Sequence, residues 1–214
     1  MSNRLFVISG CASSGLDVSA RVLTALGAPC GHEEVFHTGA FSSGGTLYWP
    51  PKVVGDASWF AAPVLSKLPE SSVVLHQIRH PLATIHDLYE SKFFEEESEA
   101  RHFVQDFLPE TRLGGPLVRC MRFWLQWNRM VENASDYEDL IYRRHRIEDL
   151  DPRTTAEMTA LLGLCRDRST TGRVLEELRP GEFTGPPEGL SWDDLPTGRL
   201  RLDVQAAAET YGYC

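Results

Sequence analysis

The sequence predicts an α/β protein with a parallel sheet of about four or five strands flanked by layers of helices. Residues 4–9 form a short apolar run ended by Gly10, which is the pattern of a buried strand. A loop of glycine and serine follows, and then a helical pattern over 17–26. A second unit of this kind begins at residue 72, where an apolar run leads into a helix started by Pro81. Strands that alternate with helices in this way are typical of a parallel sheet.

The first helix is predicted from apolar residues four apart on one face, and Gly27 ends it. Residues 28–71 are rich in glycine, serine, proline and aromatic residues, so we expect an irregular lid or acceptor region there. Within it we expect only a short second strand before His32 and a short helix near 59–68.

The rest of the chain continues the same alternation without an internal repeat or a low-complexity tract. The expected elements are a strand over 72–79, a helix from 81, a helix over 116–133, a strand over 140–145, a helix over 154–164, a loop over 181–189 and a closing helix over 204–211. We therefore expect a single domain over residues 1–214.

The charge balance excludes several classes of protein. The 214 residues include 21 Lys plus Arg and 30 Asp plus Glu, which gives a net charge of −9, and 42% of them are hydrophobic. Such a chain can build a core, but it is poorly suited to binding nucleic acid or an anionic membrane surface. An anionic ligand must therefore be held by a local cluster of donors.

Cysteine use and hydropathy favour a cytoplasmic protein without a metal. The five cysteines, an odd number, include no Cys-x-x-Cys pair, so neither a zinc ribbon nor a thioredoxin motif is expected, and free thiols in a reducing compartment are favoured. No apolar stretch approaches the ~18 residues of a membrane span, and the first apolar run is too short for the core of a signal peptide. The oligomeric state stays open at this stage.

The ligand site is expected at the carboxyl ends of the strands, where open parallel sheets bind their ligands. The loop after the first strand has the spacing G-x-x-x-x-G, from Gly10 to Gly15, and leads into a helix. Its backbone N–H groups could cradle a phosphate or sulfate, although a tight turn alone would also need the glycines. Leu16 and Asp17 stand where a nucleotide triphosphatase has Lys and then Ser or Thr. A phosphoryl-transfer enzyme is therefore the least favoured hypothesis.

Arg79 ends the second apolar strand, directly before the predicted helix start at His80 and Pro81. A guanidinium in that position can bind a phosphate through two parallel hydrogen bonds. The alternative is an ion pair with one of the many carboxylates of the chain.

Taken together, these segments resemble the P-loop sulfotransferase superfamily, and most of all its small bacterial and phage members. The similar stretches follow the family's order along essentially the whole chain: 5–15, 31–33, 56–59, 78–81, 146–150, 192–196 and 211–213. The resemblance implies a three-layer P-loop-type fold. It also implies transfer of a sulfuryl group from 3′-phosphoadenosine-5′-phosphosulfate (PAPS) to a hydroxyl or amine of a small-molecule acceptor, without a metal.

The resemblance also implies a donor site. The loop residues that would hold the 5′-phosphosulfate are Gly10, Cys11, Ser13, Ser14 and Gly15. The 3′-phosphate would be held by Arg79 and by the residue at position 87, where the family has a serine and this chain has Asp87.

The chain departs from the family's pattern at the donor site. Ser13 replaces a basic residue that ordinarily contacts the sulfonate, Leu16 and Asp17 replace two threonines, and Asp87 replaces the serine. Two explanations stay open. Either the donor site has decayed and the protein is a non-catalytic binding protein, or nearby cations compensate. The candidate cations are Arg21, which follows Asp17 by four residues, and Lys52, Arg143, Arg144 and Arg146.

The proton acceptor for the small-molecule substrate is expected at His32 or Glu33. Successive strand residues point to opposite faces, so only one of the two should enter the cleft. The alternative is a solvated loop that carries Glu33, Glu34 and His37. Asp56 is a weaker candidate for the base. Trp59 and Phe60 would line an acceptor pocket or fill the core.

Overall fold

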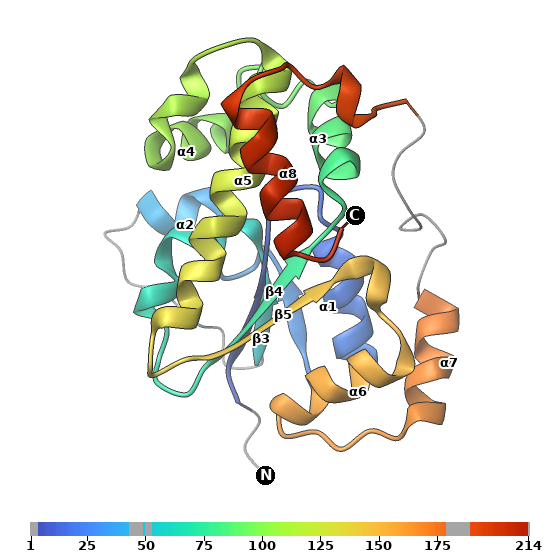
Figure 1. Ribbon diagram of the computed structural model, residues 1–214. Coiled ribbons are helices and arrows are strands. Elements are labelled where there is room, and N and C mark those ends of the chain that lie inside the picture. The colour runs from blue at the N-terminus through green and yellow to red at the C-terminus, as the bar shows by residue number, and fades with distance from the viewer. Residues whose placement is uncertain (1–3, 43–48, 50–52, 179–188, 214) are drawn as a thin grey trace.

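A computed structural model describes residues 4–42, 49, 53–178 and 189–213. Its strands form a five-stranded sheet in the order β2-β3-β1-β4-β5, and every neighbouring pair is parallel (Figure 1). The strands are β1 (Phe6–Ser9), β2 (Cys30–His32), β3 (Gly55–Ala57), β4 (Val73–Ile78) and β5 (Ile141–Arg146). The predicted α/β class with a helix-flanked parallel sheet is confirmed.

Burial of the central strands shows that both faces of the sheet are covered. All side chains of β1 and β4 are buried, and successive strand residues point to opposite faces. These two strands pair in register from Phe6 with Val73 to Ser9 with His76. Their continuous apolar runs are what a parallel sheet between two helical layers requires.

Eight α-helices lie among the described residues and surround the sheet. They are α1 (Leu16–Ala25), α2 (Thr38–Ser42), α3 (Pro81–Glu90), α4 (Glu99–Phe107), α5 (Pro116–Glu132), α6 (Pro152–Leu161), α7 (Arg168–Leu178) and α8 (Arg199–Thr210). The 3₁₀ helices are η1 (Trp59–Lys67), η2 (Pro109–Arg112), η3 (Asn133–Asp136), η4 (Ile147–Asp149) and η6 (Trp192–Asp194).

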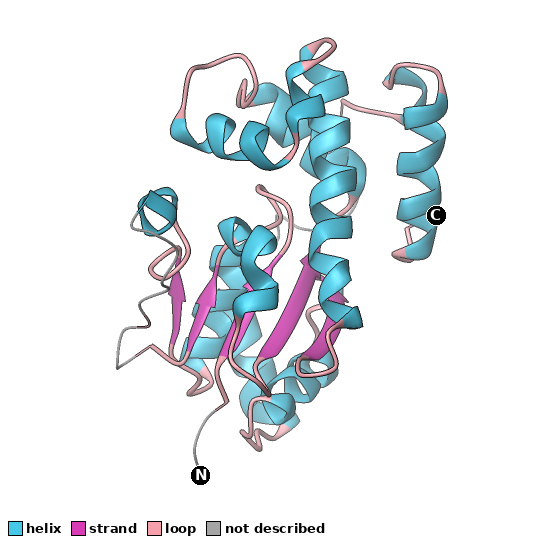
Figure 2. Cartoon of the chain, turned by 90° about the vertical axis from the view of Figure 1, so that its left-hand side faces the viewer, coloured by secondary structure: helices cyan, strands magenta, loops and turns pink. Residues whose placement is uncertain are grey.

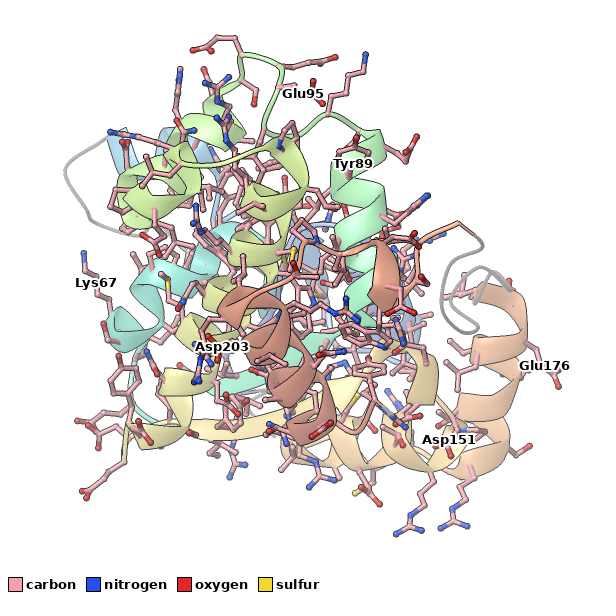
Figure 3. All side chains as sticks on the ribbon, turned by 45° about the horizontal axis from the view of Figure 1, so that its top comes forward. Lys67, Tyr89, Glu95, Asp151, Glu176 and Asp203 are labelled. Atoms are coloured by element: carbon pink, nitrogen blue, oxygen red, sulfur yellow. The ribbon has the colours of Figure 1, made fainter. Side chains whose placement is uncertain are left out.

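The helices divide into two packed groups. Helix α1 contacts β1, β2 and β3, and α7 packs against both α1 and α6. Helix α5 contacts β4 and packs against α3, α8 and η1 (Figures 1 and 2). Charged side chains such as those of Lys67, Glu95 and Glu176 project from the outside of this assembly (Figure 3).

The chain leaves neighbouring strands toward different groups of helices. Strand β1 leads into α1, whereas its neighbours β3 and β4 lead into η1 and α3, which pack with α5. The chain segments after β1 and β4 therefore lead to different groups of helices from the carboxyl edge of the sheet. Open α/β sheets form their ligand crevice at such a place.

Strand β3 was not expected within residues 28–71. It is only three residues long and contains Gly55, and both features hide a strand from a sequence pattern. The structure requires this glycine because a Cβ there would lie 2.1 Å from the Phe6 ring. Residues 43–48 and 50–52 of the expected lid lie outside the described residues, and so does most of the expected loop over 181–189.

In the part of the chain that the structure describes, no helix combines the length and the apolar character needed to span a bilayer.

Candidate functional site

The loop from Gly10 to Gly15 joins β1 to α1 at the carboxyl edge of the sheet. A Cβ on Gly10 would lie 2.0 Å from the backbone oxygen of Gln77, so this glycine is needed for the close approach of the loop to β4. Gly15 has φ +78° and Ser13 has φ +64°, both in the left-handed region. A left-handed serine costs about 1–2 kcal/mol relative to ordinary backbone. The surrounding contacts must hold the loop in this conformation.

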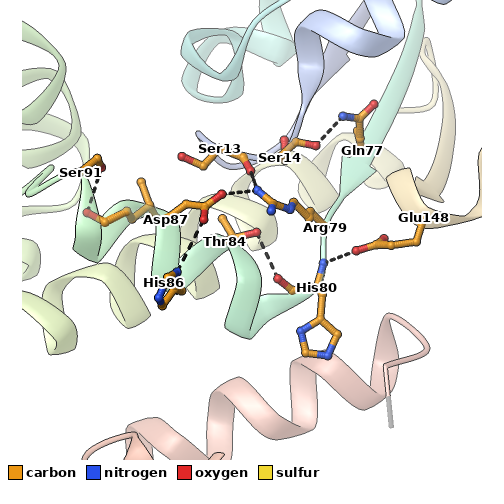
Figure 4. A network of polar contacts seen from close by, with 11 residues as sticks. Ser13, Ser14, Gln77, Arg79, His80, Thr84, His86, Asp87, Ser91 and Glu148 are labelled. Carbon is orange, nitrogen blue, oxygen red and sulfur yellow. Dashed lines mark hydrogen bonds and ion pairs between the residues drawn. The ribbon is translucent and has the colours of Figure 1, made fainter. Parts of the chain in front are cut away.

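Two contacts hold the loop from β4. The amide Nε2 of Gln77 donates to the backbone oxygen of Ser14 at 2.7 Å, and Nη1 of Arg79 donates to that of Ser13 at 2.9 Å (Figure 4). The Oε1 of Gln77 accepts from Ser19 Oγ on α1 and lies 3.3 Å from His145 Nε2 on β5. Burial lowers the pKa of His145 from 6.5 to about 4, so its ring is neutral at pH 7.

Gln77 is a site residue to which the sequence interpretation gave no role. Its signal was visible as a polar residue inside the apolar run of β4, where a buried polar group needs partners.

The loop presents unused hydrogen-bond donors. Ser14 is 1% exposed, and its Oγ has no hydrogen-bond partner among the described residues. The N-cap of α1 is Gly15, which supplies no side-chain cap to the first N–H groups of the helix. A buried hydroxyl beside an uncapped helix N-terminus is a donor set that suits a phosphate or sulfate oxygen.

Arg79 lies beside this donor set but is already paired. Its guanidinium forms a close ion pair with Asp87 of α3, as Figure 4 shows. The Arg79 side chain is 14% exposed and that of Asp87 is 42% exposed. His86 Nδ1 lies 3.7 Å from the other oxygen of Asp87. The structure thus brings together Arg79 and Asp87, which were both predicted for the donor site, but the Asp87 carboxylate binds the guanidinium that would hold a phosphate.

The backbone directly after Arg79 is also anchored. The His80 N–H donates to Glu148 Oε1 at 2.7 Å, and the Tyr213 hydroxyl donates to Glu148 Oε2 at 2.8 Å. The rings of His80 and Tyr213 meet edge to face at 5.1 Å. Glu148 therefore fixes the start of α3, a role that the sequence interpretation did not assign.

The two acidic residues nearest the donor set each pair with an arginine. Asp17 pairs with Arg21 at 3.2 Å, as its spacing predicted, and Asp87 pairs with Arg79. The arginines of β5 pair with other carboxylates: Arg143 with Glu157, Arg144 with Glu132 and Arg146 with Asp149. Lys52 lies outside the described residues.

His32 is the last residue of β2, and Glu33 follows it at the same edge of the sheet. Glu33 has φ +56° and is half-buried, and its backbone N–H donates to Ala57 O at 3.1 Å. Burial raises the pKa of the Glu33 carboxyl above its usual range, against the opposing effects of His32 and a hydrogen bond with the Trp59 side chain. His32 is exposed and lines a groove beside α1. The two side chains therefore have different surroundings, and Glu33 is the one that contacts Trp59.

Asp56 has a structural task. Its carboxylate is 0% exposed and accepts the backbone N–H groups of Glu34, Val35 and Phe36 at 3.1, 3.2 and 3.1 Å. These bonds shape the turn that presents Glu33 and leave the carboxylate little capacity to act as a base.

Trp59 and Phe60 belong to an aromatic cluster in the core. Trp59 meets Phe123 at 5.8 Å and Trp127 at 5.6 Å between ring centroids, and Phe60 meets Phe103 at 5.0 Å. Both are less than 8% exposed, at 7% and 6%. Filling the core is thus the main role of these two rings.

No group of three or more His, Cys, Asp or Glu side chains is placed to hold a metal ion within the described residues. No protein-family model matches the chain, and no curated protein sequence matches it either.

Proposed function

We propose that this protein is a sulfotransferase that moves a sulfuryl group from PAPS to a hydroxyl or amine of a small molecule. The observation that carries the proposal is the buried, unpartnered hydroxyl of Ser14 beside the uncapped N-terminus of α1. An unpaired buried hydroxyl costs about 1–3 kcal/mol, a cost that a bound anion would remove. The protein's net charge of −9 opposes anions in general, so donors concentrated at one loop favour a specific anion site.

The bound donor would supply a sulfuryl group that is already activated. Ser14 and the first N–H groups of α1 would hold its 5′-phosphosulfate, where charge develops during transfer. Arg79 would hold its 3′-phosphate after the ion pair between Arg79 and Asp87 breaks. Cys11, buried in the same loop, would only fill space, because burial raises the pKa of its thiol well above the ordinary value.

Glu33 is the better candidate for the base that takes the proton from the acceptor. Its raised pKa makes it a stronger base than an ordinary glutamate. Its left-handed backbone is one of four such non-glycine positions among the described residues, and Ser13 is another. Strained backbone of this kind is often retained at functional sites.

A non-catalytic binding protein is the second candidate, and the Arg79–Asp87 ion pair favours it. The carboxylate already occupies the guanidinium that the donor's 3′-phosphate would need. The two candidates differ in one measurable property, which is the affinity for adenosine 3′,5′-bisphosphate, the nucleotide left after transfer.

Thermal unfolding with and without this bisphosphate tests the proposal. At 100 times the dissociation constant, binding adds about 2.7 kcal/mol to the free energy of unfolding. Arg79→Ala should weaken the affinity by roughly 1.5–3 kcal/mol, the range for a hydrogen bond to a charged group. Arg112→Ala, which removes an exposed arginine paired with Asp106 at 3.4 Å, is the matched control and should bind like wild type. An unchanged melting temperature at millimolar bisphosphate would favour the second candidate.

Turnover of labelled PAPS with a panel of hydroxyl and amine acceptors then separates binding from transfer. Glu33→Gln should lower the rate by about 10²–10⁴-fold, the usual contribution of a general base, and should leave bisphosphate affinity unchanged. Equal rates for this variant and wild type would remove Glu33 from the mechanism.

A further inference from the structure

A groove of about 590 Å³ lies between α1 and the edge strand β2, and Leu178 at the end of α7 lines it. The groove is separate from the Ser14–Arg79 donor set, although it begins close to it. Asp17, in the first turn of α1, lies at one end, just after the glycine-rich loop. Its volume lies in the range of small-molecule sites in proteins, about 300–1,000 Å³.

Small and apolar groups form much of the groove wall. Ala20 and Ala25 of α1 lie there with Cys30 of β2 and Leu178. Burial raises the pKa of the Cys30 thiol far above its ordinary value, so at neutral pH the sulfur is an uncharged part of this wall. A chain of methylene groups is the chemistry that such a wall would bind.

The exposed edge of β2 is not open for a further strand at this point. Thr24 Oγ1 donates to the backbone oxygen of Cys30 at 3.2 Å and accepts its N–H at 3.0 Å. Because one side chain satisfies both backbone groups, pairing with an added peptide strand would have to break these bonds. A small molecule therefore fits the groove better than an extended peptide.

The polar end of the groove carries excess negative charge. Asp17 is neutralised by Arg21 at 3.2 Å. The carboxylate of Glu34 has no hydrogen bond and no ion pair within the described part of the chain, and His32 stands beside it on the rim. A positively charged group at this end would complement Glu34, whereas an anion would be repelled.

We propose that this groove binds a primary amine carried on a short apolar chain, with the ammonium at Glu34 and the chain along Ala20, Ala25 and Leu178. The site goes beyond the proposed function, because binding of the amine does not require the donor.

Calorimetric titration of the full chain with hexylamine, hexan-1-ol and hexanoate tests the site. Hexylamine should bind about fivefold tighter than hexan-1-ol, which corresponds to the ~1 kcal/mol of an exposed ion pair, and hexanoate should bind weakest. Glu34→Gln should abolish the preference for the amine and leave the affinity for the alcohol unchanged. Equal affinities of wild type for the amine and the alcohol, or a preference that survives in Glu34→Gln, would overturn the proposal.

A blocking variant tests the location. Ala25 is exposed, so Ala25→Trp can fill the groove without disturbing the core, and it should abolish binding of both hexylamine and hexan-1-ol. Ala160→Trp, at an exposed position of α6 outside the groove, is the matched control and should bind like wild type. Unchanged hexylamine binding in Ala25→Trp would place the amine elsewhere and overturn the assignment.

Adenosine bisphosphate titrations in the same variants keep the two proposals apart. Hexylamine binding without bisphosphate binding would retain the amine site and reject the sulfotransferase function. Bisphosphate binding with no amine binding would do the reverse.

Discussion

Replacing Asp87 with serine is the perturbation that separates a compensated donor site from a decayed one. Asp87 holds the guanidinium of Arg79, which also donates to the backbone oxygen of Ser13 at 2.9 Å. An incoming 3′-phosphate must displace this carboxylate and remain near its negative charge. Asp87→Ser removes the competitor and the repulsion, and it leaves Arg79 bonded to the loop.

The magnitude follows from distance and exposure. Two unit charges ~4 Å apart interact by about 4 kcal/mol at an effective dielectric constant near 20. The Asp87 side chain is 42% exposed and that of Arg79 is 14% exposed. Solvent screening therefore reduces this repulsion, and the partly exposed pair with Arg79 is itself worth about 1 kcal/mol. We therefore expect Asp87→Ser to tighten binding of adenosine 3′,5′-bisphosphate by at least about tenfold, or ~1.4 kcal/mol.

Isothermal titration of wild type, Asp87→Ser, Arg79→Ala and the double variant measures this effect and its dependence on the guanidinium. The gain should vanish in the Arg79→Ala background, because no guanidinium is then released. Asp106→Ser is the control for net charge, since it removes one exposed carboxylate from a remote ion pair with Arg112. Unchanged or weaker binding by Asp87→Ser would refute the reasoning and show that the carboxylate is tolerated or used by the bound nucleotide.

Three further predictions concern stability. Ser13→Gly should raise the free energy of unfolding by about 0.5–1 kcal/mol. It relieves the left-handed backbone strain of ~1–2 kcal/mol, and the greater conformational entropy of glycine in the unfolded chain offsets part of this gain. Asp56→Ala should lower the free energy of unfolding by about 3 kcal/mol or more, because it leaves three backbone N–H groups without their acceptor. Burial lowers the pKa of His76 from 6.5 to about 3. Between these pH values the His76 ring is protonated in the unfolded chain but neutral in the folded protein. The free energy of unfolding should therefore fall as the pH decreases, and His76 contributes up to about 1.4 kcal/mol of this fall per pH unit. His76→Gln should make the dependence on pH less steep.

Urea unfolding checks all three. A destabilised Ser13→Gly variant would mean that the serine side chain outweighs its backbone strain. Wild-type stability of Asp56→Ala would remove the structural role assigned to Asp56. Parallel pH profiles for wild type and His76→Gln would contradict the buried, neutral state of His76.

Local sequence patterns determined the frame of the fold. The apolar runs of β1 and β4 and the glycine stop after α1 were visible because long buried strands and amphipathic helices carry periodic signals. Helix α5 was predicted within a residue or two of its bounds, Pro116–Glu132, for the same reason. Helices α2, α4 and α7 were not predicted, and β3 was missed because three residues carry no measurable period.

At the candidate site, the sequence by itself determined which residue types reach the carboxyl edge of the sheet: the Gly10–Gly15 loop, Arg79 and the pair His32 and Glu33. Only the tertiary structure decided which groups they meet. Arg79 and Asp87 are eight residues apart, yet whether the arginine points at α3 or at an open crevice depends on how β4, α3 and the loop pack. The three N–H groups on Asp56 and the groove between α1 and β2 likewise join segments distant in the chain. Hydrogen bonds and ion pairs act over a few ångströms in space, and spacing along a sequence does not encode that distance once a chain has folded back on itself.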